Sequence, residues 1–347
     1  MIFNLIKKIQ TDLMRLIICG MGVVGQSFIK LLVDNINPLY KKYGIRPRVV
    51  ACIDKGGIAY SQTGLDLEKV IMVKKKFGTV SKYSQNKYSF DNPIENIESE
   101  IFLELTPTNL VSGEPGLSNI ISALRTQKNV ITVNKGPLAL SFPSLIELAN
   151  YNNVMLRFSG TVGGGTPILE FAKHCLKGDK ITSFTGILNG TTNYILTKMT
   201  EGLTFEEALS DAKIKGYAET EPSLDVNGDD AAAKLVIMAN WIMGRRVTLK
   251  NVDKKGITAV SLDEIKEAKK NGKNIKLIAK CDNKNLYVKP DLILEDDPIC
   301  VNGTLNAVSF ESEHSGKQTI IGKGAGGMET ASSILRDLIE IKENFSA

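Results

Sequence analysis

An acidic stretch that ends beside a single lysine has the residue types and spacing to do chemistry. Acids are concentrated between Glu219 and Asp230, and Lys234 follows four residues later. Gly228 gives the backbone freedom, and Asp229 is expected to cap a helix that continues through alanines and aliphatic residues. Asp230 then lies in the first turn, where negative charge is favoured, and its spacing from Lys234 puts both on one helix face. The sequence therefore predicts a carboxylate and an ammonium in contact.

Two interpretations of Lys234 follow from its surroundings. The residues around it in the helix are small or apolar, which predicts burial on several sides. Burial lowers the pKa of an ammonium and neighbouring carboxylates raise it, so the balance could suit Lys234 to proton transfer. The alternative is a structural ion pair at a helix start, and the local sequence leaves both open.

A glycine-rich turn near the start of the chain predicts a dinucleotide site. A short apolar run, residues 16–20, fits a buried parallel strand and leads through a G-x-G-x-x-G turn into an apolar-periodic helix. The first glycine permits a tight turn, the second lets the backbone approach a pyrophosphate, and the third lets helix and strand pack closely. A turn without a ligand is the alternative. The cofactor contacts predicted here are Gly20, Gly22, Val23, Val24 and Gly25.

Further candidates follow other expected strands. The strand at residues 48–53 ends in Asp54, an acid that would favour NAD, but Lys55 would accept the 2′-phosphate of NADP, so the preference stays open. Thr106 follows the strand at 100–105, and Lys135 follows the strand at 129–133. Ligands bind at the carboxyl ends of parallel strands, so Thr106 is a candidate cofactor contact and Lys135 a second site lysine.

The second half of the chain has a different character. Strands are expected at residues 181–188, 275–279, 286–289 and 307–310, among helices that start at Ser261 and, with a capping box, at Thr204. Residues 189–193 place hydroxyls and amides before a helix expected to begin near Tyr194. A glycine-rich loop, residues 160–167, could present carbonyls to a cation or amides to an anion, or form only a tight corner.

Composition restricts the class of protein. The 347 residues are 43% hydrophobic and 23% charged, which is ordinary for a soluble protein, and the net charge is +5. The basic residues are scattered, whereas nucleic-acid binding would require a concentrated basic face. The cysteines are odd in number and widely spaced, which indicates a reduced cytosolic compartment, and two histidines exclude a multi-histidine metal site. No apolar run is long enough to cross a bilayer.

These patterns predict an α/β protein with a Rossmann-type dinucleotide-binding domain and an α+β catalytic and dimerisation domain with a mixed sheet. Residues 1–13 lack the features of a signal peptide and are interpreted as an N-terminal extension. A glycine-rich strand-to-helix turn near the end of the chain indicates a return to the first domain. The dinucleotide-binding domain is therefore expected at 14–155 with 319–347, and the catalytic domain at 156–318.

The combined motifs resemble homoserine dehydrogenase in its short form, which has neither a kinase nor an ACT domain. They occur in that family's order over nearly the whole chain. The motifs are the G-x-G-x-x-G turn, V-N-K-x-x-L at 133–138, V-G-G-G-x-P at 162–167, N-G-T-T-N-Y-I at 189–195, G-Y-A-E at 216–219, D-x-x-G-x-D-x-x-x-K at 225–234 and G-x-G-A-G at 322–326.

The resemblance implies reversible, NAD(P)H-dependent reduction of L-aspartate 4-semialdehyde to L-homoserine, in the biosynthesis of threonine, methionine and isoleucine. Lys234 is then the first choice to stabilise charge on the aldehyde oxygen and to supply a proton, and Lys135 would lie between cofactor and substrate. A cytoplasmic homodimer is expected. The other implied site residues are Glu219, Asp225, Asp230, Gly190 and Thr191 for substrate, and Gly326 for cofactor.

A monovalent cation is a further expectation for the glycine-rich loop, on the carbonyls of Val162, Gly164 and Thr166. Ser159 stands where many relatives carry Glu, which weakens that expectation. Two alternatives to the family activity are considered. One is another two-domain NAD(P)-dependent amino-acid dehydrogenase; the other is a non-catalytic dinucleotide-sensing protein, which would bind nucleotide without turnover and would not depend on Lys234.

Overall fold

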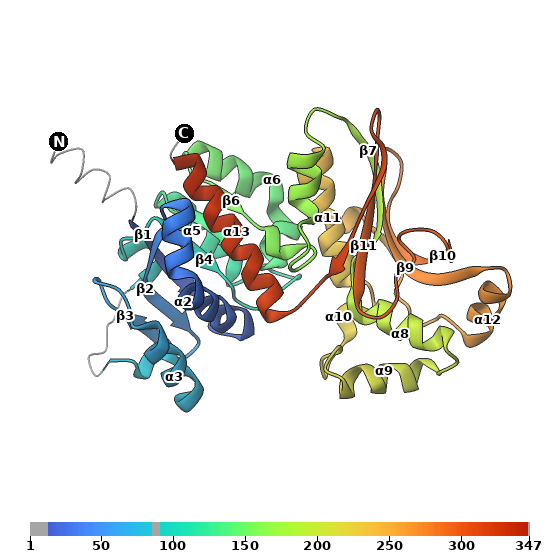
Figure 1. The fold of residues 1–347 in the computed structure, drawn as a ribbon, viewed down its shortest axis with the longest axis horizontal. Helices are drawn as coiled ribbons and strands as arrows, with labels where there is room; N and C mark the ends of the chain where they lie inside the picture. The colour runs from blue at the N-terminus through green and yellow to red at the C-terminus, as the bar shows by residue number, and fades with distance from the viewer. Residues whose placement is uncertain (1–12, 85–90, 346–347) are drawn as a thin grey trace. The chain divides into compact units, whose positions relative to one another are not determined.

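A computed structural model describes residues 13–84 and 91–345. The chain forms two units, Met1–Thr161 with Gly326–Ala347, and Val162–Ala325 (Figure 1). The expected N-terminal extension lies outside the described residues except for Leu13, which opens the first strand.

A six-stranded sheet with the order β3-β2-β1-β4-β5-β6 forms the centre of the first unit. All its pairings are parallel except that of β3, which returns antiparallel along β2 directly after Asp54. The strands expected before the first glycine turn and at 48–53, 100–105 and 129–133 are confirmed, and the sheet ends in the two-residue strand Leu156–Arg157. The strands are β1 (Leu13–Cys19), β2 (Arg46–Asp54), β3 (Gly57–Tyr60), β4 (Ile101–Glu104), β5 (Asn129–Thr132) and β6 (Leu156–Arg157).

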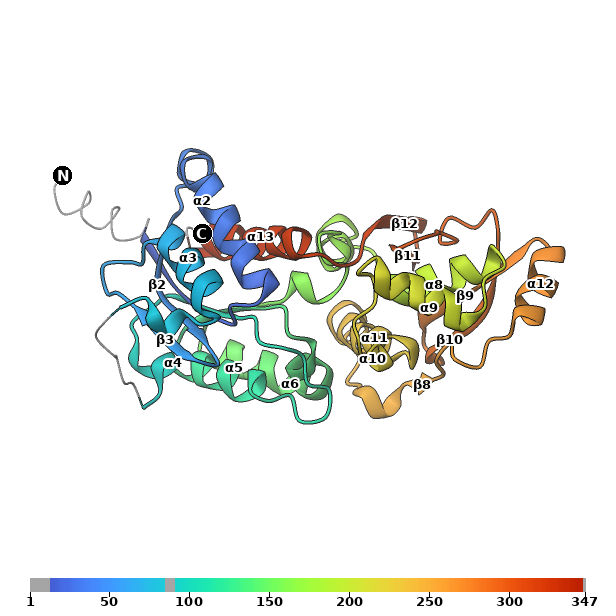
Figure 2. The same cartoon turned by 90° about the horizontal axis from the view of Figure 1, so that it is seen from below.

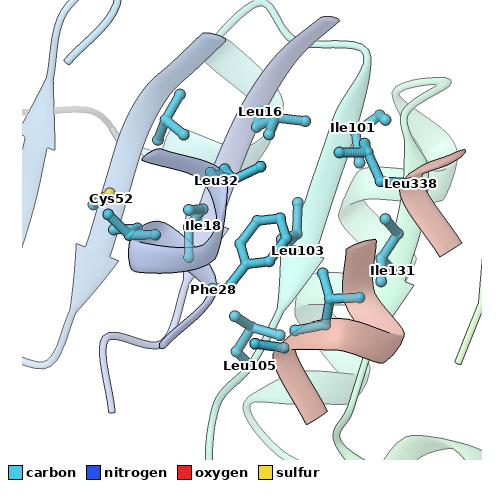
Figure 3. Packing of buried hydrophobic residues seen from close by; sticks show 14 of the residues in the cluster. Leu16, Ile18, Phe28, Leu32, Cys52, Ile101, Leu103, Leu105, Ile131 and Leu338 are labelled. Atoms are coloured by element: carbon cyan, nitrogen blue, oxygen red, sulfur yellow. The ribbon is translucent and has the colours of Figure 1, made fainter. Parts of the chain in front are cut away.

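Helices α2 and α13 cover one face of this sheet, although they come from opposite ends of the chain (Figures 1 and 2). Phe28 of α2 and Leu338 of α13 are fully buried against Leu16 and Leu103 of the sheet (Figure 3). The apolar strand face thus determines where both helices pack. The helical segments of this unit are α2 (Val23–Tyr43), α3 (Leu67–Phe77), η1 (Val80–Lys82), α4 (Pro93–Asn96), α5 (Gly116–Arg125), α6 (Lys135–Tyr151), η2 (Ser159–Thr161) and α13 (Gly327–Phe345).

The second unit contains a mixed sheet with the order β12-β11-β7-β9-β10-β8, as the sequence predicts. Its pairings are antiparallel except that of β8 with β10. The strands are β7 (Ile181–Ile187), β8 (Asp253–Lys254), β9 (Lys273–Cys281), β10 (Leu286–Leu294), β11 (Leu305–Ser312) and β12 (Gly316–Lys323).

The helical segments of the second unit confirm the capping box predicted at Thr204 and the helix start predicted at Ser261, where the structure also has a capping box. These segments are α7 (Ile168–Glu170), η3 (Phe171–Cys175), α8 (Gly190–Thr200), α9 (Phe205–Ile214), α10 (Ser223–Val226), α11 (Asp229–Met243), η4 (Leu249–Asn251) and α12 (Leu262–Lys270).

Two predicted helix starts in this unit are wrong. α8 begins at Gly190 rather than near Tyr194, because the side chain of Asn189 caps it by accepting a hydrogen bond from the Thr192 amide. α11 begins at Asp229, with Gly228 as its N-cap in the left-handed conformation and no side-chain cap. The carboxylate of Asp229 instead forms an ion pair with Lys254 of β8.

Within residues 13–84 and 91–345, no helix combines the length and the apolar character needed to cross a membrane. All five cysteines are free thiols.

Candidate active site

The ion pair predicted from the i to i+4 spacing is present in the second unit. Lys234 Nζ lies 2.7 Å from Asp230 Oδ2, and the Lys234 side chain is only 8% exposed. Lys234 also donates a hydrogen bond of 2.7 Å to the carbonyl of Leu188, at the end of β7. These two partners hold the ammonium in one position at the end of the second sheet.

Asn189 joins the two acids nearest to this lysine. Its Nδ2 donates to Asp225 Oδ1 at 2.6 Å and to Asp230 Oδ2 at 2.9 Å. Its Oδ1 accepts the Thr192 amide at 2.9 Å, so the same side chain caps α8 and bridges both carboxylates. We call Asn189, Asp225, Asp230 and Lys234 the acid–lysine cluster. Asn189 is not among the site residues predicted from the sequence. The signal for it is an Asn immediately before Gly-Thr-Thr, which is typical of an N-cap.

The acid–lysine cluster changes the charge behaviour of Asp225. Burial, followed by the repulsion of Asp230, raises the pKa of Asp225, while hydrogen bonds from Asn189 and the charge of Lys234 lower it. The net effect is a raised pKa, so Asp225 binds a proton at a pH where an ordinary aspartate is ionised. Asp225 is consequently the acid whose charge depends most directly on its neighbours.

The other predicted substrate residues differ in how they relate to the acid–lysine cluster. Gly190 and Thr191 form the first turn of α8, directly after Asn189. The hydroxyl of Thr191 donates to the Tyr217 carbonyl at 2.7 Å, and the same side chain is also a hydrogen-bond partner of Asp225, whose pKa it lowers. Glu219 is exposed and forms no hydrogen bond or ion pair with the described residues. Hydrogen bonds and an ion pair therefore join Asp225, Asp230 and Lys234, whereas Glu219 makes no such bond to them.

The predicted dinucleotide turn in the first unit has the local geometry that a pyrophosphate requires. Gly20 has a φ of +107°, and a Cβ there would lie 2.4 Å from the Leu105 carbonyl carbon. A Cβ on Gly25 would lie 2.2 Å from the Gly20 carbonyl oxygen, so these two glycines allow the turn and the close packing. A Cβ on Gly22 would meet nothing within 4 Å, which leaves the backbone open at the start of α2. The turn thus fits a bound phosphate group.

A second glycine turn lies against the first. α13 begins after Gly326, and a Cβ on Gly327 would lie 2.7 Å from Val23 Cγ1 and 2.8 Å from Ser27 Oγ. The N-terminal ends of α2 and α13 therefore meet (Figure 2). Val23 is 73% exposed at this position. Two helix N-termini, each with a partial positive charge, face the same region and favour an anion there.

Asp54, the acid after β2, is already satisfied by protein donors. Its carboxylate pairs with Lys74 Nζ at 2.7 Å and accepts hydrogen bonds from the Thr79 hydroxyl at 2.9 Å and the Val80 amide at 3.0 Å. Burial alone would raise the pKa of Asp54, but these hydrogen bonds outweigh it and hold the pKa below its usual range. The neighbouring Lys55 is exposed.

Thr106 and Lys135 lie on a hydrogen-bonded network at the carboxyl edge of the first sheet. The fully buried Glu104 accepts the Thr106 amide at 2.8 Å. Asn134 Nδ2 donates to the Thr106 hydroxyl at 3.2 Å, and Asn134 Oδ1 caps α6, whose first residue is Lys135. Burial raises the pKa of Glu104 despite its hydrogen bonds. Glu104 is not among the site residues predicted from the sequence, because it falls within an apolar run typical of a buried strand.

The loop proposed for a cation is a tight turn. The Thr166 amide donates to the Gly163 carbonyl, and the Thr166 carbonyl accepts the Ile168 amide at 2.8 Å, so one of the three proposed carbonyls already has a partner. The Ser159 amide donates to the buried carboxylate of Asp337 at 3.0 Å. Within the described part of the chain, no group of three or more His, Cys, Asp or Glu residues is arranged to hold a metal. A cation on Val162, Gly164 and Thr166 therefore stays a prediction.

Known proteins match both halves of the chain. A family model described as homoserine dehydrogenase matches residues 167–339, and one described as glutamate/leucine/phenylalanine/valine dehydrogenase matches residues 2–151. A homoserine dehydrogenase from Methanocaldococcus jannaschii is 44% identical over 331 residues, which cover 94% of this chain and 98% of the relative. The chain belongs to the homoserine dehydrogenase family.

Two further members of the homoserine dehydrogenase family are described with different cofactors. An NAD(+)-dependent homoserine dehydrogenase from Pseudomonas canavaninivorans is 37% identical, with 95% of this chain and 96% of the relative covered. A solved structure of a hyperthermophilic archaeal homoserine dehydrogenase in complex with NADPH is 27% identical, has a TM-score of 0.83, and covers 96% of this chain and 98% of that one. These findings confirm the family resemblance and the fold class. They also confirm that the protein is a nicotinamide-dependent oxidoreductase, and they leave its preference between NAD and NADP open.

The raised pKa of Asp225 can be tested by removing its charged neighbour. The Asp230→Asn substitution removes the like charge while keeping the side-chain shape, so the pKa of Asp225 is expected to fall toward the ordinary aspartate range. Carbon-13 NMR of labelled aspartate carboxyls, followed over pH, measures this shift. Asp229→Asn is the matched control, because Asp229 is the adjacent residue but pairs with Lys254. An unchanged pKa in Asp230→Asn would contradict this electrostatic description.

Proposed function

We propose that this chain catalyses the reversible NAD(P)H-dependent reduction of L-aspartate 4-semialdehyde to L-homoserine, with Lys234 as the catalytic residue. The observation that carries the proposal is the buried Lys234 ammonium, held at 2.7 Å by both Asp230 and the Leu188 carbonyl. The nicotinamide cofactor, when bound, supplies or accepts the hydride at the reacting carbon.

Lys234 stabilises the oxygen of the reacting carbon. When an aldehyde is reduced, negative charge develops on that oxygen, and a fixed ammonium both stabilises the charge and supplies the proton. In the reverse direction, Lys234 accepts the hydroxyl proton. Asp230 keeps the ammonium in place through both directions, because its carboxylate is itself held by Asn189.

The ionised groups of the substrate have complementary partners around the acid–lysine cluster. Asp225, with Glu219 as an exposed second acid, binds the substrate ammonium. The first-turn amides of α8, at Gly190 and Thr191, bind the substrate carboxylate through the partial positive charge of the helix N-terminus. The Thr191 contribution comes from its backbone, because its side chain is a hydrogen-bond partner of Tyr217 and Asp225.

The first unit binds the cofactor through its two glycine turns, with Gly20, Gly22, Val23, Val24, Gly25 and Gly326 as contacts. Thr106 and Lys135 extend this contact toward the nicotinamide end, since both lie at the carboxyl edge of the sheet. We assign cofactor binding to this unit, and catalysis and dimerisation to the unit Val162–Ala325.

Both NAD and NADP are accepted in this proposal. An acid after the second strand normally disfavours the 2′-phosphate of NADP by repulsion. Here the charge of Asp54 is balanced by Lys74, and its oxygens are occupied by protein donors. The exposed Lys55 is adjacent and can attract the phosphate.

A homodimer is proposed from the surface of the second sheet, and a cytoplasmic location from the five free cysteines. Leu292 and Leu294 of β10 are 51% and 54% exposed, and Ile321 of β12 is 48% exposed. A second copy of the chain that covered these strands would remove the apolar side chains from water.

The reaction is tested by mixing the purified protein with L-homoserine and either NAD⁺ or NADP⁺ and following reduced nicotinamide by absorbance. Turnover with both cofactors is the expected result. A folded protein that binds either nucleotide without turnover would contradict the proposal and support the dinucleotide-sensing alternative.

The catalytic assignment predicts the effect of Lys234→Met. This substitution keeps the length of the side chain and removes the ammonium, so kcat is expected to fall by about 10²- to 10⁴-fold. The affinity for NADPH, measured by fluorescence titration, is expected to change by less than about twofold, because the cofactor contacts are in the first unit. Lys254→Met is the control, since Lys254 pairs with the adjacent acid Asp229. A Lys234→Met protein with near-normal kcat would show that Lys234 is structural.

A further inference from the structure

Among the residues that the structure describes, the hydrogen-bond partners of a second buried lysine in the catalytic unit are all neutral groups. Lys276 of β9 is 1% exposed. Its Nζ donates to Asn193 Oδ1 at 3.0 Å, to Asn302 Oδ1 at 3.0 Å and to Thr197 Oγ1 at 3.4 Å. Unlike Lys234, it has two amide oxygens and a hydroxyl as partners rather than a carboxylate. A buried ammonium without a counter-charge is energetically costly, so its presence calls for an explanation.

The partners of Lys276 join two parts of the chain. Asn193 and Thr197 lie on α8, whereas Asn302 belongs to residues 299–305, which we call the cover segment. Lys276 therefore ties the cover segment to α8 from the sheet beneath them.

Other hydrogen bonds run between the same two parts. Asn193 Nδ2 donates to the carbonyls of Val301 at 3.1 Å and Leu305 at 3.0 Å. The Gly303 amide donates to Thr197 Oγ1 at 3.2 Å. Asn193 and Thr197 thus each accept a hydrogen bond from Lys276 and also bond to the cover segment, so the lysine fixes the side chains that hold this segment.

The contact extends to the start of α8. A Cβ on Gly190 would lie 2.7 Å from the Thr304 carbonyl oxygen, so the first residue of α8 rests directly on the cover segment. Asn189, which caps this helix, bridges Asp225 and Asp230. A shift of α8 against the cover segment would therefore move the carboxylate-binding turn and the bridge between the two acids.

We propose that Lys276 is a positioning residue for the substrate site: its ammonium locks α8 onto the cover segment and so holds Asn189 and Gly190 in their binding geometry. This inference rests on the proposed function only for the identity of the substrate.

The pKa of Lys276 lies below the ordinary range of a lysine. Burial lowers the pKa of Lys276 to about 8, and Cys300 is the titratable group that opposes this shift. The groups that face it from α8 and the cover segment are the amides of Asn193 and Asn302, the hydroxyl of Thr197 and the thiol of Cys300.

This pKa has a defined consequence for stability. An unfolded lysine keeps its proton up to its ordinary pKa of 10.5, so between pH 8 and 10.5 the unfolded state binds more protons than the folded state. The contribution of Lys276 to folding stability therefore rises with pH across that window. The folded state is less stable with protonated Lys276 than with neutral Lys276, so the lysine does not serve stability, which supports a positioning role.

The first test is Lys276→Met, which fills the same space but cannot donate. KM for homoserine is expected to rise about tenfold from the lost hydrogen bonds, while kcat and the KM for cofactor change by less than about twofold. The melting temperature at pH 7 is expected to be unchanged or higher. Lys280→Met is the control, because Lys280 lies four residues further along the same strand and pairs with Asp282. An unchanged KM, or losses in kcat, both KM values and melting temperature together, would overturn the proposal.

The second test adds a counter-charge with Asn302→Asp, which places a carboxylate beside the Lys276 ammonium and raises its pKa. In the wild type, KM for homoserine is expected to rise with a midpoint near pH 8, where Lys276 loses its charge. The midpoint is expected to move up by at least about one pH unit in Asn302→Asp and to disappear in Lys276→Met. The same midpoint in all three proteins would overturn the proposal.

A structural readout separates this inference from the catalytic one. Hydrogen exchange of the backbone amides at 189–192 is expected to be faster in Lys276→Met than in the wild type and in Lys280→Met. This measurement requires no turnover, so it tests Lys276 even if the wild type does not oxidise homoserine. Unchanged exchange at these amides would contradict the positioning role.

Discussion

The catalytic unit depends on the way two neighbouring carboxylates and one ammonium are held together out of water. Asp225 and Asp230 would repel each other if they were alone, and Lys234 would be costly to bury without a partner. The 2.7 Å contact with Asp230 gives the buried Lys234 a counter-charge, and the two hydrogen bonds from Asn189 reduce the repulsion between the carboxylates. α8, α10 and α11 each contribute to this cluster, so its geometry requires all three helices to be in place.

The cofactor unit depends instead on close approach of backbones. Side chains at Gly20 and Gly25 would collide with neighbouring main chain, whereas Gly22 leaves the start of α2 open. The C-terminal helix α13 then brings its own N-terminus to the same place, against Val23 and Ser27. Helix α13 therefore belongs to the first unit and packs beside the glycine turn that we propose binds the cofactor.

The sequence predicts the features that depend on short spacings. The Asp230–Lys234 pair, the predicted capping box and the strand before the glycine turn follow from residues within a few positions of each other. The environment of Asp54 could not be predicted, because its partners come from residues 74–80 and form only when β3 folds back along β2. The start of α8 was misplaced because the pattern of apolar residues begins at Tyr194, whereas the Asn189 cap determines the first turn.

The burial of Lys276 in β9 is another feature that the local sequence does not predict. Its alternation with Ile275 and Leu277 predicts a lysine on the solvent side, yet α8 and the cover segment bury it. Only the long-range packing of three segments reveals this position. A similar argument applies to Glu104, whose donors Thr106 and Asn119 lie in the following loop and in α5.

The central claim is that Asp230 and Lys234 act as one unit. A double-mutant cycle on kcat/KM for homoserine, with Asp230→Asn, Lys234→Met and the double variant, tests it most directly. If Asp230 acts only by holding the ammonium, the double variant should lie within about threefold of Lys234→Met alone. Losses that multiply would show that the two residues act independently and would contradict the account.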